Sequence, residues 1–489
     1  MTSELYRPQY HFTAPEQVHF PFDPNGFFFH RGRYHAFYLF QDESICDLKT
    51  CWGHASTTDF IHWEHHPVAL ACDRPGEQAI YSGCALRDKD GVPVLLYFSV
   101  GEGICLATPL DDELLQWQKS PANPVIRQPQ KGSLEYDVYN VFDPHAWLDT
   151  DGQYYMILAG GGGTQNQPYL KYDTAYLFRS PDLIQWEYLK PFYQTNGHFT
   201  RPFDDCACPD FFQIGDRYAL FCISHAGGAR YYLGDYAQHT FVPRSHHWLN
   251  GTGGVFAPES WLDDRGRRIV CFWYVNKTVE PYNVDFMECW TMPREVRLAP
   301  DGSCLLQFVP EEFRQLEGAP QELRVPVPPS GGRQTLPIHS RCGKLRLTLV
   351  LSAGQFALQM LSDASGEECL ELRIDCEAGK VLLDASKSWH PFRRTPHVVN
   401  IYQAPEYEVT PGNYMHYAPE DGRYELEIYL DNSIVEVFST DGRLACAQAV
   451  WNHPESDCMA IRMPSASHAR LEKLEFIPMG APRAADGAG

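Results

Sequence analysis

The stretch Asp149-Thr150-Asp151-Gly152-Gln153-Tyr154-Tyr155-Met156 joins a turn that contains glycine to a strand rich in aromatic residues. Glycine readily adopts the left-handed backbone of a tight turn, and aromatic residues favour extended strands. The same pattern occurs five times before residue 275, and its turn glycines are Gly32, Gly91, Gly152, Gly215 and Gly266. Successive glycines are 59, 61, 63 and 51 residues apart. A period near 60 residues with several short strands per period predicts a β-propeller, here with five blades.

A second signature recurs between these turns and ends in tryptophan. Its copies are Ser56-Thr57-Thr58-Asp59-Phe60-Ile61-His62-Trp63-Glu64, Ser180-Pro181-Asp182-Leu183-Ile184-Gln185-Trp186-Glu187 and the looser Asp111-Asp112-Glu113-Leu114-Leu115-Gln116-Trp117. The alternative interpretation is a long array of β-sandwiches in which the glycine spacing is accidental. Five turns combined with three tryptophan signatures favour the propeller.

The pattern changes after Met292-Pro293-Arg294-Glu295. We predict that residues 1–310 form the propeller and that 311–335, which is rich in Pro, Glu and Gln, is a linker. Alternating strands resume afterwards, so 336–480 is predicted to be a β-sandwich. The small residues of 481–489 predict a disordered tail. The expected fold class is therefore all-β.

Charge and composition restrict the function of this 489-residue chain. It contains 62 Asp and Glu but 40 Lys and Arg, a net charge of -22. This balance argues against nucleic acid or an anionic membrane as the main partner. The start resembles no secretory signal and no apolar run is long enough to cross a bilayer, so we expect a cytoplasmic protein. The aromatic share of 13% suits stacking against sugars.

The 16 cysteines are scattered, and without a signal sequence we expect them to be reduced. Cys206 and Cys208 form a Cys-x-Cys motif, which is a weak indication of a metal site because no second pair follows at a matching spacing. The sequence therefore predicts neither a metal nor a cofactor.

Candidate catalytic residues recur at one position of the repeat. Nine residues before the five turn glycines stand Asp23, Ser82, Asp143, Cys206 and Ala257. Both carboxylates precede proline, and a single Asp-Pro pair usually forms a turn. Their shared register in two blades favours a functional role, since the ends of inner propeller strands form a natural ligand site.

A third acid, Glu259, follows two residues after the fifth position. Converging carboxylates suit cleavage of a glycosidic bond, in which one attacks the sugar and another, held protonated, donates to the leaving oxygen.

Motifs throughout the chain resemble those of glycoside hydrolase family 32, which contains invertases, fructanases and sucrose-phosphate hydrolases. They include Asp23-Pro24-Asn25-Gly26, Trp52-Gly53-His54-Ala55, Tyr81-Ser82-Gly83, Cys208-Pro209-Asp210-Phe211-Phe212, Met292-Pro293-Arg294-Glu295 and Asp431-Asn432-Ser433-Ile434-Val435-Glu436-Val437-Phe438. The resemblance implies a catalytic five-bladed propeller, a C-terminal β-sandwich and a β-fructofuranosidase-like, retaining glycosidase. A small carbohydrate is the implied partner.

The resemblance implies that Asp23 is the nucleophile and Asp143 the stabiliser of the transition state. The family's acid/base glutamate is replaced by Ala207, which has no proton to donate. Phe22, Phe142 and Leu39 stand where the family has Asn, Arg and Gln. These changes predict altered substrate specificity, because a furanose held in the usual way would leave polar groups unpaired.

The substrate-binding residues are predicted to be Phe22, Trp52, Ser82, Phe142 and Asp205. Glu259 is the candidate proton donor that replaces the glutamate missing at Ala207. Asp205 is a rival, because an extended strand places residues 205 and 207 on one face. A retaining route needs nucleophile and acid about 5–5.5 Å apart, whereas about 6.5–9.5 Å permits an inverting route.

Two function classes remain open from the sequence. The first is a hydrolase, or a glycosyl-transferring relative, that acts on an altered furanoside or oligosaccharide. The second is a propeller that binds a glycan without cleaving it, which Ala207 favours. Retention of both Asp23 and Asp143 opposes the second class, because buried charges without a task are destabilising.

Overall fold

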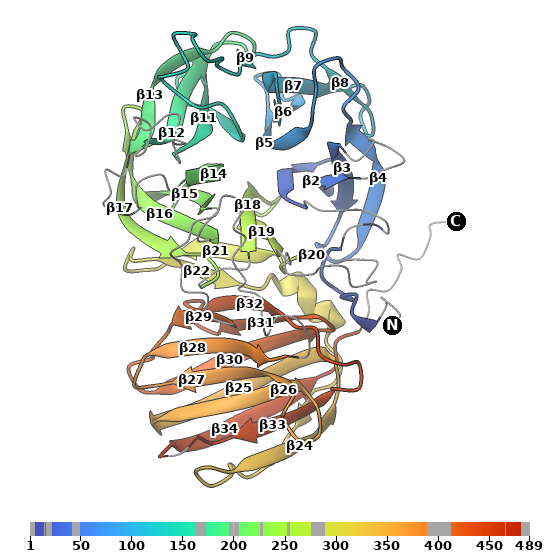
Figure 1. The fold of residues 1–489 in the computed structure, drawn as a ribbon, viewed down its shortest axis with the longest axis vertical. Helices are drawn as coiled ribbons and strands as arrows, with labels where there is room; N and C mark the ends of the chain where they lie inside the picture. The colour runs from blue at the N-terminus through green and yellow to red at the C-terminus, as the bar shows by residue number, and fades with distance from the viewer. Residues whose placement is uncertain are drawn as a thin grey trace.

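The structure, a computed structural model, describes residues 5–13, 15, 22–41, 49–161, 173–194, 199, 205–224, 228–251, 255–274, 289–388, 412–464 and 466–480. The described chain is almost entirely β and forms two domains (Figure 1). Strands β1 to β22 surround a common centre in the first domain, and β23 to β34 form two layers in the second. The predicted tail, 481–489, lies outside the described residues.

The described part of the first domain contains four hydrogen-bonded sheets. The first consists of β1 (Pro24–His30), β2 (Arg33–Gln41), β3 (Thr50–Thr57) and β4 (Trp63–Leu70). The second consists of β5 (Ile80–Arg87), β6 (Pro93–Ser99), β7 (Gly103–Pro109), β8 (Trp117–Lys119) and β9 (Ile126–Arg127). The third combines β10 (Pro144–Leu148), β11 (Tyr154–Gly161), β12 (Asp173–Ser180) and β13 (Glu187–Gln194) with β14 (Asp205–Ile214), β15 (Arg217–Ser224), β16 (Gly228–Ala237) and β17 (Thr240–Trp248). The fourth consists of β18 (Val255–Leu262), β19 (Arg268–Tyr274), β20 (Cys289–Trp290), β21 (Arg294–Leu298) and β22 (Leu305–Phe308).

The five turn glycines explain how these sheets begin. Gly32, Gly91, Gly152, Gly215 and Gly266 all have positive φ, between 60° and 84°. Each joins the first strand of a group to its antiparallel neighbour: β1 to β2, β5 to β6, β10 to β11, β14 to β15 and β18 to β19. The predicted turns are therefore confirmed. Since β11 also pairs with β14 and merges two groups into one sheet, the count of five blades stays a prediction.

The first strands of the groups form a closed ring. β1 contacts β5, β5 contacts β10, β10 contacts β14, β14 contacts β18, and β18 contacts β1. We call the side-chain bonds that join them to one another the inner-strand ring. Its bonds are Gly83 N–H to Asn25 Oδ1 (2.9 Å), Ala146 N–H to Cys84 Sγ (3.3 Å), His145 Nε2 to Phe211 O (3.1 Å), Ser260 N–H to Asp210 Oδ2 (2.8 Å), and the N–H groups of Gly26 and Phe27 to the Glu259 carboxyl group.

The second domain is a sandwich of two six-stranded sheets. One contains β23 (Gln321–Glu322), β34 (His468–Ile477), β25 (Cys342–Ala353), β30 (Arg423–Asp431), β31 (Ile434–Ser439) and β32 (Ala445–Ala449). The other contains β24 (Arg333–His339), β33 (Cys458–Arg462), β26 (Gln355–Ser362), β27 (Cys369–Asp375), β28 (Lys380–Lys387) and β29 (Gly412–His416). Leu, Ile, Val, Phe and Met side chains alternate along these strands and fill the space between the sheets. The segment predicted as a linker contains the short 3-10 helix η3 (Glu311–Leu316), β23 and the start of β24.

Buried charges connect the two domains. Arg294 on β21 forms an ion pair with Glu436 on β31, at 2.9 Å and with both side chains fully buried. His11 bonds Asp431 through Nδ1 (2.8 Å) and Glu436 through Nε2 (3.1 Å). Since an unpaired charge in the interior is costly, this network requires both domains to stay docked.

The cysteines require one correction. Fourteen of the described cysteines are reduced thiols, as expected, but Cys51 on β3 is disulfide-bonded. Cysteine count and spacing alone do not determine which thiols meet in the fold. Among the described residues, no helix has the length and apolar character required to cross a bilayer.

Candidate active site

Asp23 stands immediately before β1 and is held from two sides. Its carbonyl oxygen accepts hydrogen bonds from the N–H of Leu39 (3.0 Å) and from Asn25 Nδ2 (2.9 Å). Its carboxylate oxygen Oδ2 accepts a hydrogen bond of 2.7 Å from the Ser82 hydroxyl on β5. The predicted register therefore brings Asp23 and Ser82 together from two neighbouring inner strands.

Asp143 occupies the corresponding place before β10. Its backbone is left-handed, with φ of 41°, and the residue is 9% exposed. The carboxylate oxygen Oδ2 accepts a hydrogen bond of 3.1 Å from the N–H of Cys208. Such a backbone conformation is unfavourable for a residue other than glycine and tends to occur at functional sites.

The Cys208 thiol brings the two carboxylates together. Its Sγ lies 3.8 Å from Asp23 Oδ2 and 3.6 Å from Asp143 Oδ2. Burial and the charges of Asp143 and Asp23 raise the pKa of the Cys208 thiol well above its usual value, so the thiol keeps its proton and acts as a donor. Cys206 points elsewhere and lies beside Cys222 in the core, so the two cysteines of the Cys-x-Cys motif do not converge.

Tyr81 and Cys208 lie beside the carboxylates, although the sequence predicts neither as a substrate-site residue and marks Cys208 only as a weak candidate for a metal ligand. Tyr81 is 40% exposed, and its pKa is raised by partial burial and by the charges of Asp23 and Asp143. Irregular register between Tyr81 and Gly83, and between Ala207 and Asp210, interrupts simple strand alternation at both places. An exposed ring beside two carboxylates can stack against a sugar.

The aromatic residues predicted to bind substrate are mostly in the core. Trp52 is fully buried on β3, and its Nε1 donates a hydrogen bond of 3.0 Å to the carbonyl of Tyr81. Phe22 is also fully buried, and its ring stacks against Phe12 at 5.6 Å between centroids. Phe142 is partly buried between two hydrophobic clusters. Trp52 thus positions Tyr81, the residue next to Ser82, and Phe22 anchors the chain immediately before Asp23.

Ala207, which is predicted to stand at the family's acid/base position, is buried on β14 with 1% exposure. Asp205 begins the same strand, pairs with Gly161 on β11 and is partly exposed. The two residues are separated by one position, so regular alternation directs their side chains to the same face of β14.

Glu259 is buried deeper along the inner strands than Asp23. Its carboxyl group accepts hydrogen bonds from the N–H groups of Gly26 and Phe27, which follow Asp23 by three and four residues. Burial and the nearby charge of Asp210 raise the pKa of Glu259 well above its usual value, against the opposing effect of Arg268. The raised pKa favours the protonated form of Glu259, which lies near Asp210 and Arg268.

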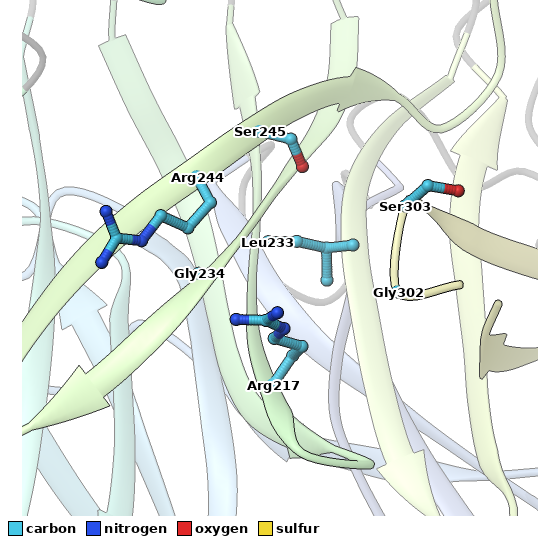
Figure 2. A pocket seen from close by; sticks show the side chains of 7 residues that line it. All are labelled: Arg217, Leu233, Gly234, Arg244, Ser245, Gly302 and Ser303. Carbon is cyan, nitrogen blue, oxygen red and sulfur yellow. The ribbon is translucent and has the colours of Figure 1, made fainter. Parts of the chain in front are cut away.

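A separate cavity of about 310 Å³ lies at the outside of β15 to β17 (Figure 2). It is lined by Arg217, Leu233, Gly234, Arg244, Ser245, Gly302 and Ser303. Both arginines form ion pairs with Asp235, which offsets their charge. None of the predicted site residues lines this cavity.

Comparisons with known proteins agree with the geometry. Residues 11–308 match the family description "Glycosyl hydrolases family 32 N-terminal domain", and residues 314–478 match "Glycosyl hydrolases family 32 C terminal". Levanase of Bacillus subtilis (strain 168) is 26% identical over 515 residues, which cover 97% of this chain and 71% of the levanase. A sucrose-6-phosphate hydrolase of Escherichia coli is 25% identical and covers 92% of this chain and 90% of its own.

Solved structures share the fold. Fructan 1-exohydrolase IIa from Cichorium intybus superimposes with a TM-score of 0.79 at 18% identity, and 98% of each chain is covered. Sucrose-6-phosphate hydrolase from Lactobacillus gasseri has a TM-score of 0.75 at 18% identity and covers 98% of this chain and 94% of its own. The paired aspartates, the β-propeller with its β-sandwich and the two matching descriptions lead to one conclusion: this chain belongs to glycoside hydrolase family 32.

Proposed function

We propose that this protein is a β-fructofuranosidase-like glycosidase that cleaves a furanoside with retention of configuration. The observation that carries the proposal is the convergence of Asp23 and Asp143 on the Cys208 thiol, with Ser82 bonded to Asp23. Two carboxylates that share a donor in this way can stabilise positive charge on a sugar ring from two sides. The names of the relatives, a levanase, sucrose-phosphate hydrolases and a fructan exohydrolase, support a small carbohydrate as the substrate.

In the proposed reaction the Asp23 carboxylate attacks the anomeric carbon. The bond from that carbon to the leaving oxygen breaks, and its electron pair stays on the oxygen. Ser82 and Cys208 donate hydrogen bonds that favour the ionised form of the nucleophile. Asp143 faces the same centre and stabilises the oxocarbenium-like charge. Water then cleaves the covalent sugar–Asp23 ester and yields the free sugar.

Glu259 is our proposed proton donor to the leaving oxygen. Its raised pKa supports this role, because an acid catalyst has to be protonated at the working pH. To protonate a leaving group beside Asp23, the Glu259 carboxyl group has to give up its hydrogen bonds with the Gly26 and Phe27 N–H groups and contact the substrate oxygen instead. Asp205 is the competing donor, since it stands on the same face of β14 as Ala207.

We further propose that the substrate differs from the family's usual one. Phe22 and Leu39 are buried among apolar side chains, where the family has amide side chains. Instead of those amide side chains, the ring of Tyr81 lies next to the two carboxylates. A substrate with fewer hydroxyl contacts and a face that stacks on a ring suits this arrangement.

The test is a panel of fructofuranosides and related furanosides with natural and with activated leaving groups. We expect turnover that Asp23→Ala and Asp143→Asn abolish. Glu259→Gln should reduce turnover of natural substrates by roughly 10²–10⁴-fold and spare activated ones, which need no acid. If Glu259→Gln stays active on natural substrates and Asp205→Asn does not, Asp205 is the donor.

Ala207 favours one other function, the recognition of a glycan without cleavage. The same panel separates the two proposals. Saturable binding with no product, unaffected by Asp23→Asn, would support the binding protein and refute the hydrolase. Products longer than the substrate would instead identify a glycosyl-transferring relative.

A further inference from the structure

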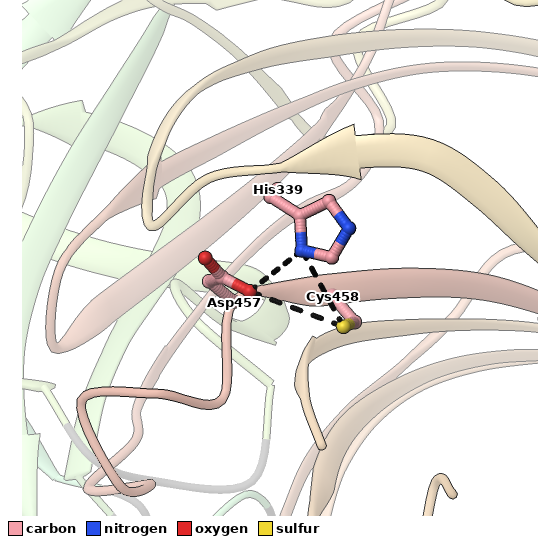
Figure 3. Close-up of side chains that lie close together, drawn as sticks. All are labelled: His339, Asp457 and Cys458. Carbon is pink, nitrogen blue, oxygen red and sulfur yellow. Dashed lines mark hydrogen bonds and ion pairs between the residues drawn. The ribbon is translucent and has the colours of Figure 1, made fainter. Parts of the chain in front are cut away.

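A histidine, an aspartate and a cysteine meet on the second domain, far along the chain from the carboxylate pair. His339 ends β24, Cys458 begins β33, and Asp457 precedes Cys458. Figure 3 shows the three side chains pointing toward one another. His339 Nδ1 lies 2.9 Å from Asp457 Oδ1 and 3.6 Å from Cys458 Sγ, and this Sγ lies 3.9 Å from Asp457 Oδ1. Within the described ranges, these residues form the one group of three such ligands.

The spacing of the three atoms approaches that of a tetrahedral zinc site. Zinc binds nitrogen and oxygen at about 2.0–2.2 Å and sulfur at about 2.3 Å, so tetrahedral geometry separates nitrogen from sulfur by about 3.5 Å and nitrogen from oxygen by about 3.4 Å. The nitrogen–sulfur distance already fits. The Asp457 oxygen has to move by a few tenths of an ångström, which a carboxylate on a partly exposed side chain can do.

The backbone holds two of the ligands in place. His339 and Cys458 are direct partners in the antiparallel register of β24 and β33, which places their Cβ atoms close together. The N–H of Ser340 bonds the Asp457 carbonyl at 2.9 Å and fixes the third ligand. Because these contacts already hold the backbone of the three ligands, the protein has to rearrange little when an ion binds.

The exposure of the ligands suits an ion that keeps one open position. Cys458 is buried, whereas the side chains of His339 and Asp457 are 64% and 37% exposed. Solvent can thus supply a fourth ligand. With a neutral imidazole, the carboxylate and a thiolate together neutralise a divalent cation.

We propose that His339, Asp457 and Cys458 form a binding site for a zinc-type divalent cation on the sandwich. The nitrogen, oxygen and sulfur donors match zinc and cobalt and disfavour magnesium and calcium, which prefer oxygen alone. The thiol loses its proton to solvent on binding, so affinity rises with pH. The site lies on the second domain, and its ligands are not among the residues proposed for hydrolysis.

The test is titration of the metal-free full chain with Co²⁺ and then with Zn²⁺. We expect one equivalent of Co²⁺ with a thiolate-to-cobalt absorption band that Zn²⁺ displaces. Cys458→Ser should abolish the band, and His339→Ala should weaken binding by at least about tenfold, as a ligand loss does. Cys376→Ser is the matched control, because Cys376 is a partly buried thiol of the same domain that bonds the Gly354 carbonyl.

The control should bind like the unchanged chain. The proposal is overturned if no thiolate band forms, or if the band survives in Cys458→Ser. Thermal unfolding of each variant without metal verifies folding, and Zn²⁺ should raise the melting temperature of the unchanged chain but not of Cys458→Ser.

Discussion

At the scale of single residues, the site depends on positions where the strand geometry is irregular. Asp143 and Cys208 both have left-handed backbones, with φ of 41° and 44°. Together with the register shift after Tyr81, these turns direct the Asp143 carboxylate, the Cys208 thiol and the Tyr81 ring toward Asp23. Local backbone strain is thus used to gather groups that regular alternation would separate.

The Ser82 hydroxyl is expected to set the reactivity of Asp23. Ser82→Ala removes the 2.7 Å hydrogen bond to the carboxylate, worth about 1.5–3 kcal/mol, so kcat/KM should fall roughly 10- to 100-fold. The acidic limb of the pH–rate profile should move to higher pH, because the ionised form is less stabilised. The measurement is kcat/KM against pH with an activated furanoside.

Ser99→Ala is the control for this change. Ser99 is fully buried on β6, and its hydroxyl has no hydrogen-bond partner in the described part of the chain. Its loss should leave the pH profile unchanged. An equal fall in both variants would mean that Ser82 acts only through packing.

At the scale of elements, the inner-strand ring connects each first strand to the next. Asp210 accepts a hydrogen bond from the Ser260 N–H on β18, and Glu259 accepts hydrogen bonds from N–H groups at the irregular point of β1. A bulge leaves N–H groups outside the ladder, and an acceptor from the neighbouring strand satisfies them. Glu259 closes the ring, because it joins the last of these strands to the first.

Glu259→Ala is expected to destabilise the propeller, since it leaves two N–H groups without an acceptor, each worth about 1–3 kcal/mol. Glu259→Gln keeps an acceptor and should not destabilise. The folded pKa of Glu259 is raised by burial, so above pH 4.5 the unfolded chain loses a proton that the folded chain retains, and stability falls with pH. Glu259→Gln removes this loss of stability with pH, because glutamine has no proton to lose.

Urea unfolding of the unchanged chain and both variants at pH 4 and pH 7 measures these effects. Relative to the unchanged chain, Glu259→Gln should gain stability between the two pH values. Equal stability of Glu259→Ala and Glu259→Gln would show that the ring needs no acceptor there.

At the scale of the molecule, the two domains behave as one unit because their contact buries charge. Glu436→Gln should lower the free energy of unfolding by about 3–5 kcal/mol, since it leaves the buried Arg294 without its anion. Glu187→Gln removes an exposed pair with Arg179 and should change stability by less than about 1 kcal/mol. Urea denaturation compares the two, and similar losses would contradict the role assigned to burial.

The same contact should make stability depend on pH through His11. Burial lowers the pKa of His11, but hydrogen bonds to Asp431 and Glu436 outweigh it and raise the pKa to about 9. The stabilisation is therefore complete below pH 6.5 and is lost as pH rises through about 9. Unfolding free energies between pH 6 and 9.5 should fall in the unchanged chain and less in His11→Asn. A flat profile in the unchanged chain would contradict the charged state of His11.

Much of the site could be read from the repeat, because a shared register in successive strands places residues at one end of a common centre. The shared register predicts Asp23, Ser82 and Asp143 in this way. Trp52 and Phe22 show where prediction from the sequence ends. Their residue types suit stacking against a sugar, but both side chains are buried and instead hold the backbone of the site in place. Tyr81 and Cys208 are not predicted as substrate-site residues, because period-two alternation does not hold across a bulge.

The sequence by itself determined the two all-β domains, the five turns and the aspartates, because glycine conformation and hydrophobic alternation are local properties. Only the tertiary structure decided that Glu259 lies beside Asp210 and the β1 amides, that Cys208 connects the two aspartates, and that His339 meets Cys458. Those contacts join residues distant in the chain, and their geometry depends on bulges and on strand packing that no short stretch of sequence specifies.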